Sequence, residues 1–475
     1  MRQPTADNIA VAHDTRGDLP DGTGKQLILY SLIWSLALLA AVPFAAAYSG
    51  EGAHLFSGFC ILLTSPSKLV TDYFNLGGLG ASFLNAALCG LACNLMMLIT
   101  RARPSANLLA GYFLVIAHCF YGLNFVNMWP PFFGAFVFCL VFRKPFGKLL
   151  HLAMFATSLG PFISDLLFRY TLGDRFDPAH PQVTPLGVLL ALLFGLGAGF
   201  IVPALLGGTT AMHRGFNLFK AGLAIGLFGM FAYALLYKTL GFPVPDVVVR
   251  DNPLYFDDGE RYILFMNVFF VLIFAATLLL GFLGNKRSFR GYGEIWRCDG
   301  LNEDFPKMFG MPLTLINIGV YGLFILVYMN AIFFLTAGVG FSGPSVGATI
   351  AAITFASSGQ TPRTVWPIML GYTLFSLLIG GVCFAAGVPL LWSLSAQGYI
   401  NGFAFATGLC PFSGRYGWKV GTIAGMLHAI LCTSTAAMHG GFVLYNGGLT
   451  SGLTALLLIP ILDFYAVKEK PSARK

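Results

Sequence analysis

Charged side chains are scarce in this chain. Only 10% of its 475 residues are Asp, Glu, Lys or Arg, while 56% are hydrophobic. Soluble domains usually carry about 25% charged residues, so this composition excludes a soluble globular protein. Apolar runs long enough to cross the hydrocarbon core of a bilayer recur along the chain, which predicts an all-α polytopic membrane protein. The clearest runs lie at 26–48, 76–100, 185–208, 262–284, 311–337 and 441–464.

Sequence motifs of several enzyme and pump classes are also missing. The nine cysteines form no CxxC pair and no zinc-type group with histidine, which argues against a disulfide framework and a metal site. The absence of GxxxxGK[ST] excludes an ATP-driven pump within this chain, and no HExxH occurs. We therefore expect no enzyme activity, no cofactor and no metal. The net charge of +8 matches basic loops beside membrane helices, so no nucleic acid is expected as a partner.

An internal repeat is the most informative pattern that is present. Residues 155–162 read FATSLGPF and residues 405–412 read FATGLCPF. Residues 212–227 likewise match 438–453. Two further blocks keep constant offsets: Gly122, Trp129, Pro130 and Gly134 match Gly359, Trp366, Pro367 and Gly371, and Asp72, Gly78, Asn85 and Gly90 match Asp304, Gly310, Asn317 and Gly322. Four matched blocks in the same order predict two tandem homologous helical repeats.

The repeat divides the chain into five parts. These are a polar tail at 1–25, repeat one at 26–241, an acidic extracytoplasmic linker at 242–261, repeat two at 262–467 and a basic tail at 468–475.

The distribution of basic residues predicts that the two repeats are inverted. Lys and Arg tend to stay in cytoplasmic loops. The loop at 143–148 is basic and its counterpart at 384–400 has no Lys or Arg, while 286–297 is basic and its counterpart at 49–67 is not. We therefore expect a multi-pass protein of the cell (inner) membrane with both termini in the cytoplasm.

The tracing gives seven crossings in each copy, or about 12 to 14 transmembrane segments in all. The segments at 107–122, 343–359 and 397–413 barely reach across a core of about 30 Å. We interpret some of them as half-helices or re-entrant segments.

The repeated FATxLxPF segments are the best candidates for a solute site. Pro161 and Pro411 interrupt helical hydrogen bonding at equivalent places. Thr157 and Thr407 lie four residues earlier, where their hydroxyls can contact a solute. Broken helices at equivalent positions of inverted repeats are typical of secondary transporter sites. The alternative is a pair of proline kinks in which each threonine bonds to its own helix.

Ionisable residues near these segments form a second group of candidates. Asp165 and Arg415 occupy equivalent positions and are predicted to act as a charge or coupling pair, or else to mark helix ends. His213 and His439 are equivalent too, and are predicted to act as gate residues because histidine titrates near neutral pH. Their alternative role is to cap helices near the membrane surface.

Asn85 and Asn317 lie within apolar runs, where an amide needs hydrogen-bond partners. They are interpreted as solute-binding residues, with helix–helix packing as the alternative.

Three stretches resemble a family of bacterial multi-pass membrane proteins that is described as a domain of unknown function. They are residues 69–88, 405–429 and 438–448. A fainter likeness to urea channels is carried by Tyr445 and Asn446, although repeat one has Phe219 and Lys220 instead and the channels' Leu-Pro signature is missing. The seven-plus-seven inverted plan is similar to that of nucleobase and anion transporters. That likeness concerns the fold, which does not fix function.

Taken together, these patterns predict a membrane transporter or facilitator for a small polar or anionic solute, with its site between the inverted repeats. A passive channel of urea-channel type and a membrane enzyme acting on a lipid-linked substrate are the alternatives. The partners expected are membrane lipid, a small-molecule solute and, as an open alternative, further copies of the same chain.

Overall fold

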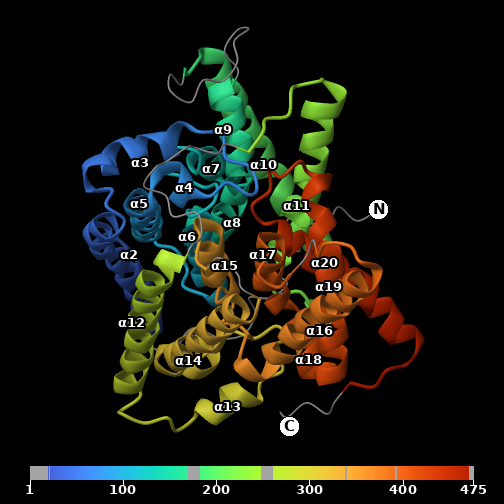
Figure 1. Cartoon of the computed structure of the whole chain (residues 1–475). Coiled ribbons are helices and arrows are strands. Elements are labelled where there is room, and N and C mark those ends of the chain that lie inside the picture. Colours follow the sequence, from blue (N-terminus) through green and yellow to red (C-terminus); the bar gives the residue numbers. More distant parts are fainter. Residues whose placement is uncertain are drawn as a thin grey trace.

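The computed structural model describes residues 20, 22–169, 182–247, 260–336, 340–390 and 393–469. Every regular element within these ranges is a helix (Figure 1). The predicted tails and the acidic linker fall largely outside the described ranges.

Repeat one begins with two long helices separated by short ones and ends with the pair α10 and α11. Its elements are α2 (Thr23–Tyr48), η1 (Gly52–His54), α3 (Leu55–Thr64), α4 (Tyr73–Gly77), α5 (Leu79–Ile99), α6 (Ala106–His118), α7 (Trp129–Val141), α8 (Phe146–Ala156), η2 (Thr157–Leu159), α9 (Gly160–Arg169), α10 (Pro185–Met212), α11 (Lys220–Tyr233) and η3 (Ala234–Thr239).

Repeat two follows the same order. Its elements are α12 (Glu260–Gly284), α13 (Tyr292–Arg297), α14 (Phe305–Leu335), α15 (Gly343–Ala352), α16 (Pro362–Ala386), α17 (Gln397–Ala406), η4 (Thr407–Leu409), α18 (Cys410–Tyr416), α19 (Trp418–Met438) and α20 (Asn446–Phe464). The equivalent pairs are α2/α12, α5/α14, α6/α15, α7/α16, α8/α17, η2/η4, α10/α19 and α11/α20. The structure thus contains two tandem helical repeats, as the sequence predicts.

Ten helices in the described part of the chain are long and apolar enough to cross a membrane. The remaining predicted segments are shorter: α6 and α7 have 13 residues each and α15 has 10, while α17 and α18 are separated by the η4 turn. The sequence marks α6, α15 and the segment of α17 and η4 as half-helices or re-entrant, whereas the shortness of α7 was not predicted. Figure 1 shows α6, α8, α15 and α17 in the middle of the molecule.

The outer surface is apolar while polar side chains are buried, the reverse of a water-soluble protein. Phe44, Phe56, Phe231, Phe334 and Phe384 are all at least 70% exposed. Large exposed apolar surface is unfavourable in water and is accommodated by lipid. The chain is therefore a multi-pass membrane protein.

The short helices α6 and α15 pack side by side and run in opposite directions. The first residue of α15, Gly343, is so close to the end of α6 that a Cβ there would lie 2.5 Å from the Phe120 carbonyl oxygen. The first residue of each helix also donates its backbone N–H to an aspartate of the other repeat. Gly343 N–H donates to Asp72 Oδ1 at 3.0 Å, and the equivalent Ala106 N–H donates to Asp304 Oδ2 at 3.4 Å. The two copies therefore exchange matching bonds across their interface.

Candidate functional site

Two broken helices lie at the centre of the molecule. α8 ends in the 3-10 turn η2 before α9 begins, and α17 ends in η4 before α18. Pro161 and Pro411 are the second residues of α9 and α18, where a missing N–H costs no helical bond. Each proline therefore follows a 3-10 turn that interrupts the α-helical hydrogen bonding, while the chain continues as helix on both sides.

The two threonines of these breaks are fully buried. Thr157 donates to Met154 O and Thr407 donates to Ala404 O, each at 2.6 Å. Each hydroxyl thus bonds to its own helix. Thr407 differs because it also accepts a hydrogen bond from Gln360 Nε2 at 2.7 Å.

Each break is bonded to the loop that precedes the last helix of the other repeat. Leu218 N–H donates to Gly408 O at 2.9 Å, and the equivalent Leu444 N–H donates to Ser158 O at 2.9 Å. The loops lead directly into α11 and α20. The centre of the protein is therefore built from both copies at once.

The first turns of α11 and α20 touch each other beside the broken helices. A Cβ on Gly222 would lie 2.5 Å from the carbonyl carbon of its own equivalent, Gly448. Only glycine allows two backbones to approach this closely.

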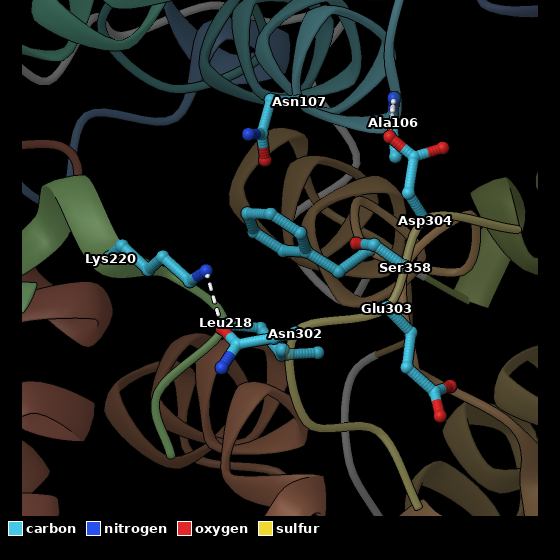
Figure 2. A pocket seen from close by; sticks show the side chains of 9 residues that line it. Ala106, Asn107, Leu218, Lys220, Asn302, Glu303, Asp304 and Ser358 are labelled. Carbon is cyan, nitrogen blue, oxygen red and sulfur yellow. Dashed lines mark hydrogen bonds between the residues drawn. The ribbon is translucent and has the colours of Figure 1, made fainter. Parts of the chain in front are cut away.

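A polar pocket of about 90 Å³ lies beside this centre and receives residues from both repeats (Figure 2). Repeat one lines it with the first turns of α6 and α11, and repeat two with the segment before α14 and the residues just after α15. The lining residues are Ala106, Asn107, Leu218, Lys220, Asn302, Glu303, Asp304, Phe355 and Ser358.

Lys220 is the only cation among these lining residues. It is the first residue of α11, and its Nζ donates to Asn302 Oδ1 at 3.0 Å. Figure 2 shows the Lys220 ammonium pointing toward Asn302, which lies beside it. The positive end of the α11 dipole lies at the same place, so this wall of the pocket favours negative charge.

The two carboxylates of the pocket behave differently. Asp304 caps α14 by accepting from Lys307 N at 3.1 Å and also accepts from Ala106 N, so it holds the starts of two helices. Figure 2 shows the Glu303 carboxylate directed away from Lys220.

In repeat two, the position equivalent to Lys220 is occupied by Asn446, which has no charge. Asn446 Oδ1 lies 3.0 Å from His439 Nε2, and His439 Nδ1 accepts from Val443 N at 3.3 Å, so His439 is a neutral ring bonded at both nitrogens. His213 is buried as well, but neither of its ring nitrogens has a hydrogen-bond partner among the described residues. Burial, and to a smaller extent the Lys220 ammonium, lower the pKa of His213 to about 4.

The two predicted asparagines hold the turns that follow α6 and α15. Asn85 Nδ2 donates to the carbonyls of Cys119 and Leu123, both at 2.9 Å. Asn317 Nδ2 donates to the equivalent carbonyls of residues 356 and 360 at 2.7 and 2.9 Å. Neither asparagine lines the pocket.

Asp165 and Arg415 have separate partners and are not paired with each other. The Tyr237 hydroxyl donates to Asp165 within the buried end of repeat one. Arg415 Nε lies 2.8 Å from Asp299 Oδ2, and its Nη1 lies 3.1 Å from Glu469 Oε2. The structure thus brings the predicted threonines and prolines to the centre and places this charged pair elsewhere.

Lys220 and Asn302 were not predicted from the sequence as site residues. A signal was present, because the repeat alignment sets Lys220 against Asn446 at the start of an apolar helix. The sequence Gly-Pro-Ser-Val-Gly at 343–347 has the GxSxG spacing of hydrolases. Ser345, however, belongs to the capping box of α15, so its hydroxyl has a structural role. No group of three metal-ligating side chains occurs in the described ranges.

Comparison with known proteins identifies a family and no relative of known function. No curated protein and no solved structure matches this chain. A family model described as a protein of unknown function (DUF1576) matches residues 52–238 and 284–464, which correspond to repeat one and repeat two. Because the match covers most of the chain, this protein belongs to the DUF1576 family.

Proposed function

We propose that the protein is a membrane transporter or facilitator for a small polar or anionic solute, which binds between the two repeats. The observation that carries this proposal is the pocket of about 90 Å³ lined by both copies. Broken helices and meeting helix starts beside it leave backbone groups that a solute can contact.

The proposal includes inverted repeats. The antiparallel packing of α6 and α15 supports it, as does the exchange of matching bonds between Asp72 and Asp304. α6 and α7 support it too, because Arg103 N–H before α6 donates to Gly147 O after α7 at 3.1 Å. Because the hairpin of α6 and α7 returns to the side of the membrane on which it begins, the crossings of repeat one are its five long helices. An odd number of crossings places the start of repeat two on the opposite side of the membrane, so repeat two is inverted relative to repeat one.

A difference between the equivalent leucines supports alternating access. Leu444 lies against Gly122, where a Cβ would be 2.5 Å from its Cδ2 atom. The equivalent Leu218 instead borders the pocket. We propose that the two sides exchange these arrangements during transport, with the pocket facing the cytoplasm in this structure.

The test is uptake by purified protein in proteoliposomes, using a panel of small anions, amides and amines. We expect saturable uptake of at least one solute class. Leu218→Trp, which fills the pocket, should abolish uptake, whereas Leu240→Trp should not because Leu240 is exposed on the outer surface. Uptake that never saturates and does not respond to Leu218→Trp would point to a passive channel elsewhere in the protein.

A further inference from the structure

We propose that the pocket binds a small organic monoanion, a short-chain carboxylate, through the ammonium group of Lys220. This inference rests on the proposed function and names the chemical class of its solute. It starts from a cation that the rest of the described structure leaves without a counter-ion.

The ammonium of Lys220 has more donors than the protein uses. It carries three N–H donors, and its one hydrogen bond within the described ranges goes to the neutral amide of Asn302. It forms no ion pair with any described carboxylate. A cation held partly buried beside an apolar core is costly unless an anion approaches it, and a carboxylate ligand supplies both charge and acceptors.

The charge of the pocket limits the ligand to one negative charge. Asp304 lines the same pocket, and its two oxygens already accept from Lys307 and Ala106 at two helix starts. Glu303 is a second carboxylate in the lining. A dianion would be only half neutralised by one ammonium and would be repelled by both carboxylates, so a monoanion fits better.

Size and lining indicate an organic anion. A volume of about 90 Å³ has room for about three water molecules at about 30 Å³ each. Phe355 and Leu218 supply apolar wall, while Asn107 and Ser358 supply hydrogen-bond donors. A carboxylate with a short apolar tail, such as acetate or lactate, uses both kinds of surface, whereas a bare inorganic ion uses only one.

Repeat two provides a natural comparison for a neutral residue at this place. Asn446 is equivalent to Lys220 and begins α20 as Lys220 begins α11. The fold therefore accommodates an asparagine at the first position of this helix. Lys220→Asn should fold and lose the charge, and Lys220→Arg should keep it.

The experiment is titration calorimetry of the full chain in detergent with acetate, lactate and acetamide. Acetamide matches acetate in shape but has no charge. We expect acetate and lactate to bind at least tenfold more tightly than acetamide. Lys220→Asn should weaken acetate binding at least tenfold, and Lys220→Arg should retain it. Lys238→Met removes the same charge from an exposed site on η3 and should leave binding unchanged.

Two results would overturn the assignment: acetamide binding as tightly as acetate, or Lys220→Asn binding acetate like the wild type while size-exclusion profiles stay normal. Failure of the transport proposal is a separate result. Carboxylate binding without uptake into proteoliposomes would reject the transporter and keep the site. Saturable uptake of a neutral solute, with no carboxylate binding, would keep the transporter and reject the site.

Discussion

Among single residues, buried polar side chains carry much of this protein's architecture. Asn85, Asn317 and the two capping aspartates each bond to backbone groups at turns or helix starts. In lipid such groups find no water, so each unsatisfied backbone group is costly. Polar residues of this kind are needed to fold the protein, and only those with unused hydrogen-bonding capacity are candidates for solute contact.

The histidines between the long helices should make stability depend on pH. Burial lowers the pKa of His213 to about 4, and burial also lowers that of His439 to about 4 against an opposing bond from Asn446. In the unfolded chain both titrate near about 6.5. The unfolded state therefore binds more protons below pH 6.5, and the free energy of unfolding falls as the pH drops toward 4. At pH 5 the loss is on the order of 2 kcal/mol per histidine.

Thermal unfolding in detergent at pH 7.5 and pH 5 measures this dependence. The wild type should lose stability between the two values, and His213→Gln should lose clearly less. An identical drop in both proteins would show that His213 does not titrate on unfolding.

Asp72 should matter for stability more than an exposed aspartate does. It caps α4 by accepting from Phe74 N at 2.9 Å and accepts from Gly343 N of the other repeat. Asp72→Ala removes a cap and a cross-repeat bond, each worth about 1 kcal/mol. We expect a lower unfolding temperature for Asp72→Ala and no change for the exposed Asp246→Ala. Equal unfolding temperatures would contradict the role of the cross-repeat bond.

Among the secondary-structure elements, the close contact of α11 with α20 requires glycine at one position of each helix. Gly222→Ala places a methyl group 2.5 Å from the Gly448 backbone, and overpacking of this kind costs about 1–3 kcal/mol. Gly208 lies within α10, and nothing is within 4 Å of the Cβ that alanine would add there. Gly222→Ala should therefore lower the unfolding temperature in detergent and Gly208→Ala should not. If both variants were equally stable, the close approach of the two helices would be wrong.

The helices and their breaks were predictable from local sequence. Runs of apolar residues gave the long helices, and Pro161 with Pro411 marked the two breaks because proline starts a helix more readily than it continues one. The bonds of Thr157 and Thr407 to their own helices match the alternative that the sequence left open. The sequence alone did not decide whether the threonines contact a solute or bond to their own helices, because that depends on which hydrogen-bonding groups the fold places near each hydroxyl.

The pocket was not predictable in the same way. Lys220, Asn302 and Asn107 come from three distant segments, and their proximity depends on how the repeats dock. Comparison of the repeats shows where Lys220 departs from Asn446, but not what that lysine faces. Asp165 and Arg415 illustrate another limit, because these equivalent residues bond to different partners in the two copies.

For the whole molecule, the proposed inverted orientation of the two repeats makes a direct topological prediction. Phe56 and Phe289 lie in corresponding regions of the two repeats and are both more than half exposed. In a variant lacking the nine native cysteines, Phe56→Cys should react with a membrane-impermeant maleimide on intact cells. Phe289→Cys should react only after the membrane is permeabilised. Reaction of both on intact cells would contradict inversion.

The crossed bonds at the centre also bear on how the protein is made. The Leu218 amide finds its acceptor on Gly408, and Leu444 reaches back to Ser158. Repeat one is translated and inserted into the membrane before Gly408 is synthesised. The Leu218 amide then lacks its acceptor, and the core of repeat one is incomplete within the lipid. Biogenesis must protect that intermediate until the last helix arrives. Two separately expressed halves should each be degraded when alone and rescued when produced together.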